Sequence, residues 1–119
     1  MMKKLTLLIT ILFVAITTQA QLNENANKIK EKSPNMYKDI KTFVSQKWAG
    51  DHEMMIYGIN QQADAVFEMA ALREKSDYDD EIFSKAFDKW SVLIDDKYVI
   101  DNVMLVYTYK KQLKAKSQY

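Results

Sequence analysis

The chain of 119 residues contains no cysteine, and it has only one proline and two glycines. The lack of cysteine excludes disulfides, thiolate zinc sites, iron–sulfur clusters, covalently attached c-type haem and cysteine nucleophiles. So few glycines and prolines argue against the many tight turns of a β-sandwich or β-barrel. A di-iron bundle is excluded as well, because it needs two Glu-x-x-His motifs and this chain has a single histidine.

Neither sign of charge dominates, since 17 Lys and Arg stand against 16 Asp and Glu. This balance argues against a dedicated nucleic-acid-binding protein, which needs an excess of basic side chains to neutralise phosphates. Hydrophobic residues make up 48% of the chain and aromatic residues 12%, a composition too apolar for a disordered protein. We therefore expect a folded domain with no nucleic-acid partner.

The N-terminus has the three parts of a secretory signal peptide. Lys3 and Lys4 supply a positive start, and an apolar run follows at positions 5–16. Thr18 and Ala20 then place small residues where a signal peptidase cleaves. The apolar run is shorter than the roughly 20 residues of a bilayer span. We predict a signal peptide at residues 1–20 and a periplasmic or secreted mature protein without a transmembrane segment; the alternative is a buried N-terminal helix or an uncleaved anchor.

Two further parts follow the signal peptide. Residues 21–32 are polar, with few large apolar side chains, and we expect a flexible lead-in. Residues 33–119 carry apolar side chains at helical spacing and show no useful length of the alternation typical of strands. The prediction is an all-α fold, a small bundle of three to four amphipathic helices in one domain.

Capping signals place the first helix boundaries. Ser33 and Pro34 are typical of a helix start, and Gly50 suits the position just after a helix end. Asp51 can cap a second helix running to about residue 75. Gly58 lies inside that helix, where we expect it to permit a close approach of a neighbouring helix rather than to form a hinge.

The boundary between the last two helices is less clear from the sequence. The acidic segment 76–81 caps a third helix, whose apolar positions extend to Ile94. Asp95 and Asp96 interrupt the pattern, and a fourth helix is expected from about Tyr98. If the interruption is not real, the two helices fuse, and the alternative architecture is a long helical hairpin that dimerises.

Two constellations suggest chemistry. His52 and Met55 share a helix face, and imidazole with thioether suits copper or haem b. Since copper sites usually hold denser His and Met clusters, we expect no cofactor and keep copper or haem b binding as an alternative function. Asp64 and Glu68 lie one helical turn apart, which makes a small carboxylate hydrolase the third hypothesis.

The sequence contains no recognised catalytic motif, while aromatic and methionine side chains are abundant for so small a core. We therefore expect a non-enzymatic exported protein that binds a protein partner, or itself, in the cell envelope or outside the cell. Weak contact with an anionic surface is expected from the lysines near the C-terminus. The expected interaction residues are Trp48, Tyr57, Tyr107 and Tyr109, and the lysines are Lys110, Lys111, Lys114 and Lys116.

Overall fold

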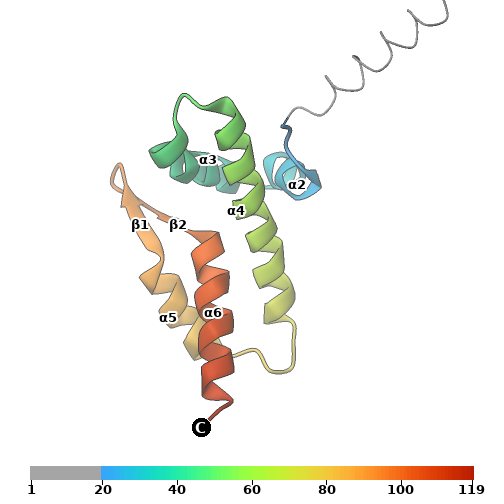
Figure 1. Ribbon diagram of the computed structural model, residues 1–119, viewed down its shortest axis with the longest axis vertical. Coiled ribbons are helices and arrows are strands. Elements are labelled where there is room, and N and C mark those ends of the chain that lie inside the picture. The colour runs from blue at the N-terminus through green and yellow to red at the C-terminus, as the bar shows by residue number, and fades with distance from the viewer. Residues whose placement is uncertain (1–19) are drawn as a thin grey trace, which may run out of the picture.

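The computed structural model describes residues 20–119, which form five helices and one two-stranded sheet (Figure 1). The prediction of a signal peptide therefore falls outside the described residues, apart from Ala20. The mostly helical fold confirms the coarse prediction, although the helix count and the sheet differ from it. The elements are α2 (Glu24–Lys32), α3 (Pro34–Trp48), α4 (His52–Arg73), α5 (Asp80–Lys89), β1 (Ser91–Ile94), β2 (Lys97–Ile100) and α6 (Asn102–Lys116).

Segment 21–32, expected to be a flexible lead-in, instead contains helix α2. Asn23 caps this helix, because its side-chain oxygen accepts a hydrogen bond from the backbone N–H of Ala26 at 2.8 Å. Ala26 and Ile29 are three residues apart, so they lie on the same face and both are buried. Two apolar positions are too short a pattern to reveal a helix in the sequence, and packing against α3 and α4 supplies the missing stability.

A β-hairpin replaces the end of the predicted third helix and the start of the fourth. Helix α5 ends at Lys89, β1 and β2 pair antiparallel, and α6 begins at Asn102. The predictions of helix up to Ile94 and from Tyr98 are therefore wrong. Segment 91–100 is rich in β-branched side chains, which favour strands, and short apolar runs fit a helix and a strand equally well.

The interruption predicted at Asp95 and Asp96 is real, and it is the turn of this hairpin. Both residues have positive φ, 50° and 64°. Two successive left-handed residues are typical of a type I′ turn, whose twist matches that of the flanking strands. Because the hairpin separates α5 from α6, the two helices do not fuse, and the long-hairpin architecture is not the one that residues 20–119 adopt.

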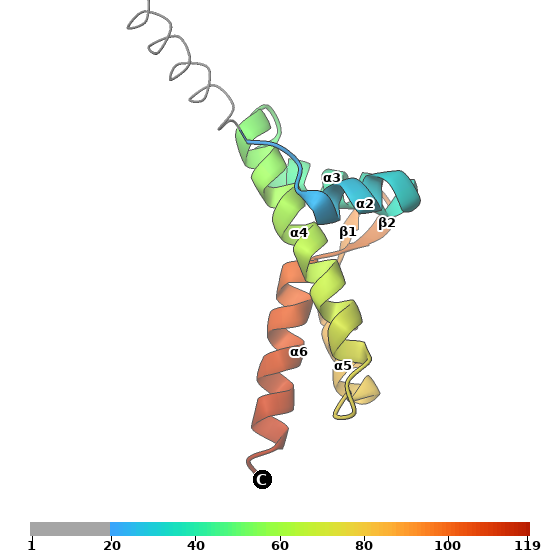
Figure 2. The ribbon, with the colours of Figure 1, turned by 90° about the vertical axis from the view of Figure 1, so that its right-hand side faces the viewer.

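Helix α4 is shared by two apolar clusters. Figure 2 shows α2 and α3 beside the upper half of α4, and α5 and α6 alongside its lower half. The first cluster lies between α2, α3 and α4, and the second between α4, α5 and α6. The buried members of the first are Ala26, Ile29, Ile40, Val44, Ile59 and Ala63; those of the second are Ala65, Met69, Ala86, Leu105, Val106 and Tyr109.

The local features predicted between α3 and α4 are confirmed. Gly50 has a φ of 89°, a left-handed conformation that favours glycine. The Asp51 side chain accepts a hydrogen bond from the Met54 N–H at 3.1 Å, so it caps α4. A β-carbon on Gly58 would lie 2.6 Å from Cγ1 of Val44, which shows that the glycine permits close packing of the two helices.

Candidate functional site

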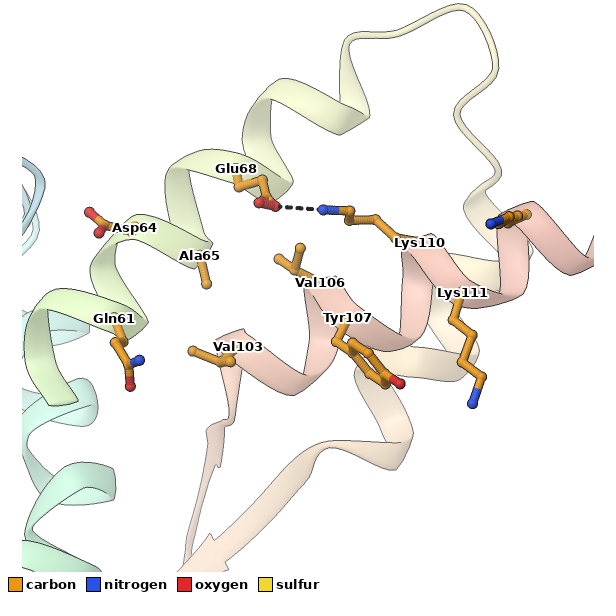
Figure 3. A pocket seen from close by; sticks show the side chains of 10 residues that line it. Gln61, Asp64, Ala65, Glu68, Val103, Val106, Tyr107, Lys110 and Lys111 are labelled. Atoms are coloured by element: carbon orange, nitrogen blue, oxygen red, sulfur yellow. Dashed lines mark hydrogen bonds and ion pairs between the residues drawn. The ribbon is translucent and has the colours of Figure 1, made fainter.

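Helices α4 and α6 lie side by side with an open hollow of about 600 Å³ between them. Its floor is apolar and consists of Ala65 from α4 with Val103 and Val106 from α6. Figure 3 shows these side chains directed into the space between the two helices, while the longer polar side chains stand around it. The hollow therefore combines an apolar base with a polar rim, the pattern found at protein interfaces.

A second hollow of about 500 Å³ continues this surface toward α3. Phe43 and Trp48 of α3 line it, together with Met104 of α6. Gln61 and Val103 line both hollows, so the two form one continuous surface depression. This combined depression is called the α4–α6 groove below.

The position of α6 beside α4 depends on Gln62, the one buried polar side chain among residues 20–119. Its Nε2 donates to Asp101 Oδ1 at 3.1 Å, and its Oε1 accepts from the Asn102 N–H at 2.7 Å. The first N–H groups of a helix have no partner inside the helix, so Gln62 satisfies one of them from outside. Sequence reasoning missed this residue; its position three after Ile59 on the buried face of α4 was the available signal.

Two of the four predicted interaction residues line the groove, and a third, Tyr57, lies beside it. Trp48 and Tyr107 line it directly. The Tyr57 hydroxyl accepts a hydrogen bond from Gln61 Nε2 at 3.0 Å, which places Tyr57 at the point where the two hollows join. Tyr57 and Tyr107 are 55% and 56% exposed. Exposed aromatic rings beside an apolar floor supply large contact area at small entropic cost, which suits protein binding.

Tyr109 does not belong to this surface. Its exposure is 0%, its hydroxyl accepts a hydrogen bond from the Asp79 backbone N–H at 3.1 Å, and its ring lies 5.9 Å from that of Tyr78. The expectation that Tyr109 lies on an exposed patch is therefore wrong. The second apolar cluster, to which α5 contributes, encloses this face of α6.

The two groove carboxylates on α4 are both engaged by neighbouring side chains. Asp64 Oδ1 accepts hydrogen bonds from the Nδ2 groups of Asn23 and Asn25, each at 3.0 Å. Glu68 pairs with Lys110 at 3.4 Å, across the groove in Figure 3. The helix does bring the carboxylates of the hydrolase hypothesis to one depression, but each one serves to hold α2 or α6 in place.

The lysines of α6 differ in whether a neighbouring side chain pairs with them. Lys110 and Lys116 form ion pairs, whereas within residues 20–119 no ion pair or hydrogen bond involves the ammonium group of Lys111 or Lys114. The Nζ of Lys111 lies 5.8 Å from the centre of the Tyr107 ring, an arrangement that stabilises the ammonium group. The end of the groove near the C-terminus therefore carries positive charge beside an exposed aromatic ring.

His52 and Met55, the pair predicted as copper or haem ligands, lie outside the α4–α6 groove. His52 and Met55 line a hollow of about 360 Å³, together with Leu22, Tyr37 and Lys41. The first turn of α4 thus brings the pair to one hollow, where Met55 also packs against the first apolar cluster. Within residues 20–119, no group of three or more His, Cys, Asp or Glu side chains is arranged to hold a metal ion. Any cofactor here would depend on one imidazole and one thioether.

Comparisons of the chain with protein-family models, with curated protein sequences and with solved structures found no match. Among the helices from residue 20 onward, none combines the length and the apolar character needed to cross a membrane. Functional inference therefore depends on the chemistry of the groove itself.

Proposed function

We propose that this protein is exported and acts without catalysis, by binding another protein through the α4–α6 groove. The observation that carries the proposal is that Trp48 of α3 and Tyr107 of α6 line one apolar depression, with Tyr57 of α4 beside it. Aromatic anchors around a desolvated base are the usual source of binding energy at protein interfaces. The unpaired ammonium groups of Lys111 and Lys114 favour an acidic binding partner.

A hydrolase is less well supported by the same groove. Acid–base catalysis needs two carboxyl groups that are free to exchange protons with a substrate. Asp64 is occupied by Asn23 and Asn25, and Glu68 by Lys110, so each carboxylate already has a structural role. Binding requires no such freedom, and it uses the apolar floor and the aromatic rings directly.

Site-specific photo-crosslinking in cells tests the binding role. A photoreactive amino acid at position 107 is expected to yield discrete crosslinks to a protein of the envelope or of the medium. The charge reversals Lys111→Glu and Lys114→Glu are expected to reduce this yield. The matched control is the same photoreactive residue at Ser84, which is exposed on α5 away from the groove. Equal crosslinking from both positions, or none from position 107, would contradict the proposal.

Export is supported by the pattern of residues 1–20 and by the attachment of the residues that follow it. The side chain of Asn60 on α4 donates to the Gln21 carbonyl at 3.0 Å and accepts from the Asn23 N–H at 2.8 Å. Among the described residues, contacts with α4 therefore already include Gln21, the residue that follows the predicted cleavage site. Mass spectrometry of the protein recovered from the periplasm or medium is expected to show a first residue of Gln21; retention of Met1 would contradict export by this signal.

A second candidate function is copper or haem b binding by His52 and Met55, favoured by their presence in one hollow. Both groups are ligands for Cu(I) or haem iron. Protein purified from the envelope should then contain copper or show a Soret band, and His52→Ala should remove either signal. Lys41 in the same hollow opposes a bound cation, so this candidate ranks second.

A further inference from the structure

The β-hairpin carries an apolar pair that residues 20–119 leave exposed. Leu93 and Tyr98 face each other across the two strands, and they are 56% and 67% exposed. Cross-strand neighbours point to the same face of a hairpin, so these two side chains form one small apolar surface. In contrast, Ile94 and Val99, which point to the other face, are buried. The hairpin therefore packs with one face and presents the other to its surroundings.

The tip next to this apolar surface is acidic. Asp95 and Asp96 form the turn, and within residues 20–119 no ion pair or side-chain hydrogen bond involves either carboxylate. The neighbouring Lys97 does not compensate them, because it pairs with Asp39 of α3 at 2.7 Å. The exposed end of the hairpin thus combines two apolar side chains with two free negative charges.

This end of the hairpin is the chemical complement of the α4–α6 groove. The groove offers an apolar floor, an exposed Tyr107 ring and the unpaired ammonium groups of Lys111 and Lys114. The hairpin does not reach that part of its own groove, because β2 lies against α3, where Lys97 also pairs with Asp39. In Figure 1 the tip lies at the opposite end of the domain from the C-terminal turns of α6.

We propose that the α4–α6 groove of one copy of this chain receives the hairpin tip of a second copy. In this arrangement Leu93 and Tyr98 pack on the apolar floor, while Asp95 and Asp96 pair with Lys111 and Lys114. The inference rests on the proposed role of the groove in protein binding, and it names the protein that binds there. Reciprocal insertion gives a twofold dimer, and one-way insertion gives a chain or ring. A contact as small as one hairpin tip is weak and depends on salt.

Sedimentation velocity of the purified mature protein tests this inference without any partner. The average mass is expected to rise between micromolar and millimolar protein at low salt. It should return to the monomer value in about 1 M NaCl, where the Debye length is about 3 Å. A monomer at every concentration and salt level overturns the inference.

Charge variants identify the two surfaces. Asp95→Asn with Asp96→Asn removes the tip charges while keeping a residue type that tolerates positive φ, so the hairpin still forms. Lys111→Glu with Lys114→Glu reverses the charge of the groove. Each pair is expected to weaken association about tenfold or more, since close charge pairs at interfaces couple strongly. The control Lys32→Glu with Lys85→Glu changes the net charge by the same amount as the Lys111 and Lys114 reversals, at surfaces outside the groove and the hairpin, and it should leave association unchanged. Equal weakening by the control overturns the inference.

Crosslinking mass spectrometry locates the contact directly. A photoreactive residue at Tyr98, in a mixture of isotopically light and heavy protein, is expected to join one copy to α6 of another. Mixed-isotope crosslinks to any other element overturn the inference. It is also overturned if Lys111 and Lys114 mediate only binding to anionic lipid vesicles while the protein remains monomeric. In that case, crosslinks from position 107 to a different protein in cells would still support the proposed function.

Discussion

Val44 of α3 occupies the space that a β-carbon on Gly58 of α4 would need, with 2.6 Å between its Cγ1 and that position. In an exposed helix, replacing glycine with alanine stabilises by about 1 kcal/mol. Here the added methyl group overpacks the helix interface, which typically costs about 1 to 3 kcal/mol, and the β-branched Val44 has little rotamer freedom to move aside.

We therefore expect Gly58→Ala to lower the free energy of unfolding by about 1 to 2 kcal/mol, as measured by urea denaturation. The matched experiment places Gly58→Ala in a Val44→Ala background, where the space is open. There the same substitution should stabilise relative to Val44→Ala alone. Stabilisation in both backgrounds would show that contact with Val44 does not destabilise alanine at position 58.

Asp96→Gly is expected to stabilise the protein by about 0.5 to 1 kcal/mol, because residue 96 has positive φ and glycine adopts that conformation without steric cost. Asp96→Val at the same position should destabilise it, since a β-branched residue is a poor fit there. Urea denaturation of both variants gives the comparison. An equal loss of stability in the two variants would contradict the type I′ turn.

Asp79 should make stability sensitive to acid. Its hydrogen bond with Lys116, and then that from the Ile82 N–H, lower the pKa of Asp79 below its ordinary value. A carboxylate whose pKa is lower in the folded state stabilises the fold above its unfolded pKa. That contribution is lost as pH falls from about 4 through the lower folded pKa. Asp79→Asn removes the charge but retains a capping side chain, so it should flatten the dependence of unfolding free energy on pH in this range.

The pKa of Lys116, the ion-pair partner of Asp79, shifts in the opposite direction. The hydrogen bond with Asp79 raises the pKa of Lys116, so its contribution is present below its unfolded pKa and lost as pH rises through the folded value. Asp79→Ala also removes the α5 cap and should be less stable than Asp79→Asn at neutral pH. Identical stability of the two variants would show that the cap contributes nothing.

Gln62→Met should lower the free energy of unfolding by about 1 to 2 kcal/mol, because it keeps the shape of the side chain but leaves the half-buried Asn102 N–H without its partner. Hydrogen exchange of the Asn102 amide should accelerate at the same time. Gln61→Met is the neighbouring control: its side chain is exposed and bonds only to Tyr57 among the described residues, so little change is expected. Unchanged exchange at Asn102 would contradict the role of Gln62 in fixing α6.

Features that depend on interactions between neighbouring residues could be predicted from the sequence. The cap at Asp51, the helix end at Gly50 and the interruption at Asp95 all follow from side-chain and backbone preferences within a few residues. Helix α2 could not be predicted in this way, because its stability comes from burying Ala26 and Ile29 against α3 and α4. The hairpin was missed for a related reason, since short apolar runs carry no decisive period.

Composition, capping residues and helical periodicity were enough to predict a cysteine-free, mainly helical protein with many aromatic residues, because these features depend only on neighbouring residues. Which of those aromatic residues are buried and which are exposed depends on how the helices pack. Tyr109 is buried and Tyr107, two residues earlier, is exposed, because α6 turns one face toward the second apolar cluster and another toward the groove. Such a choice depends on contacts between distant segments, which no local pattern records.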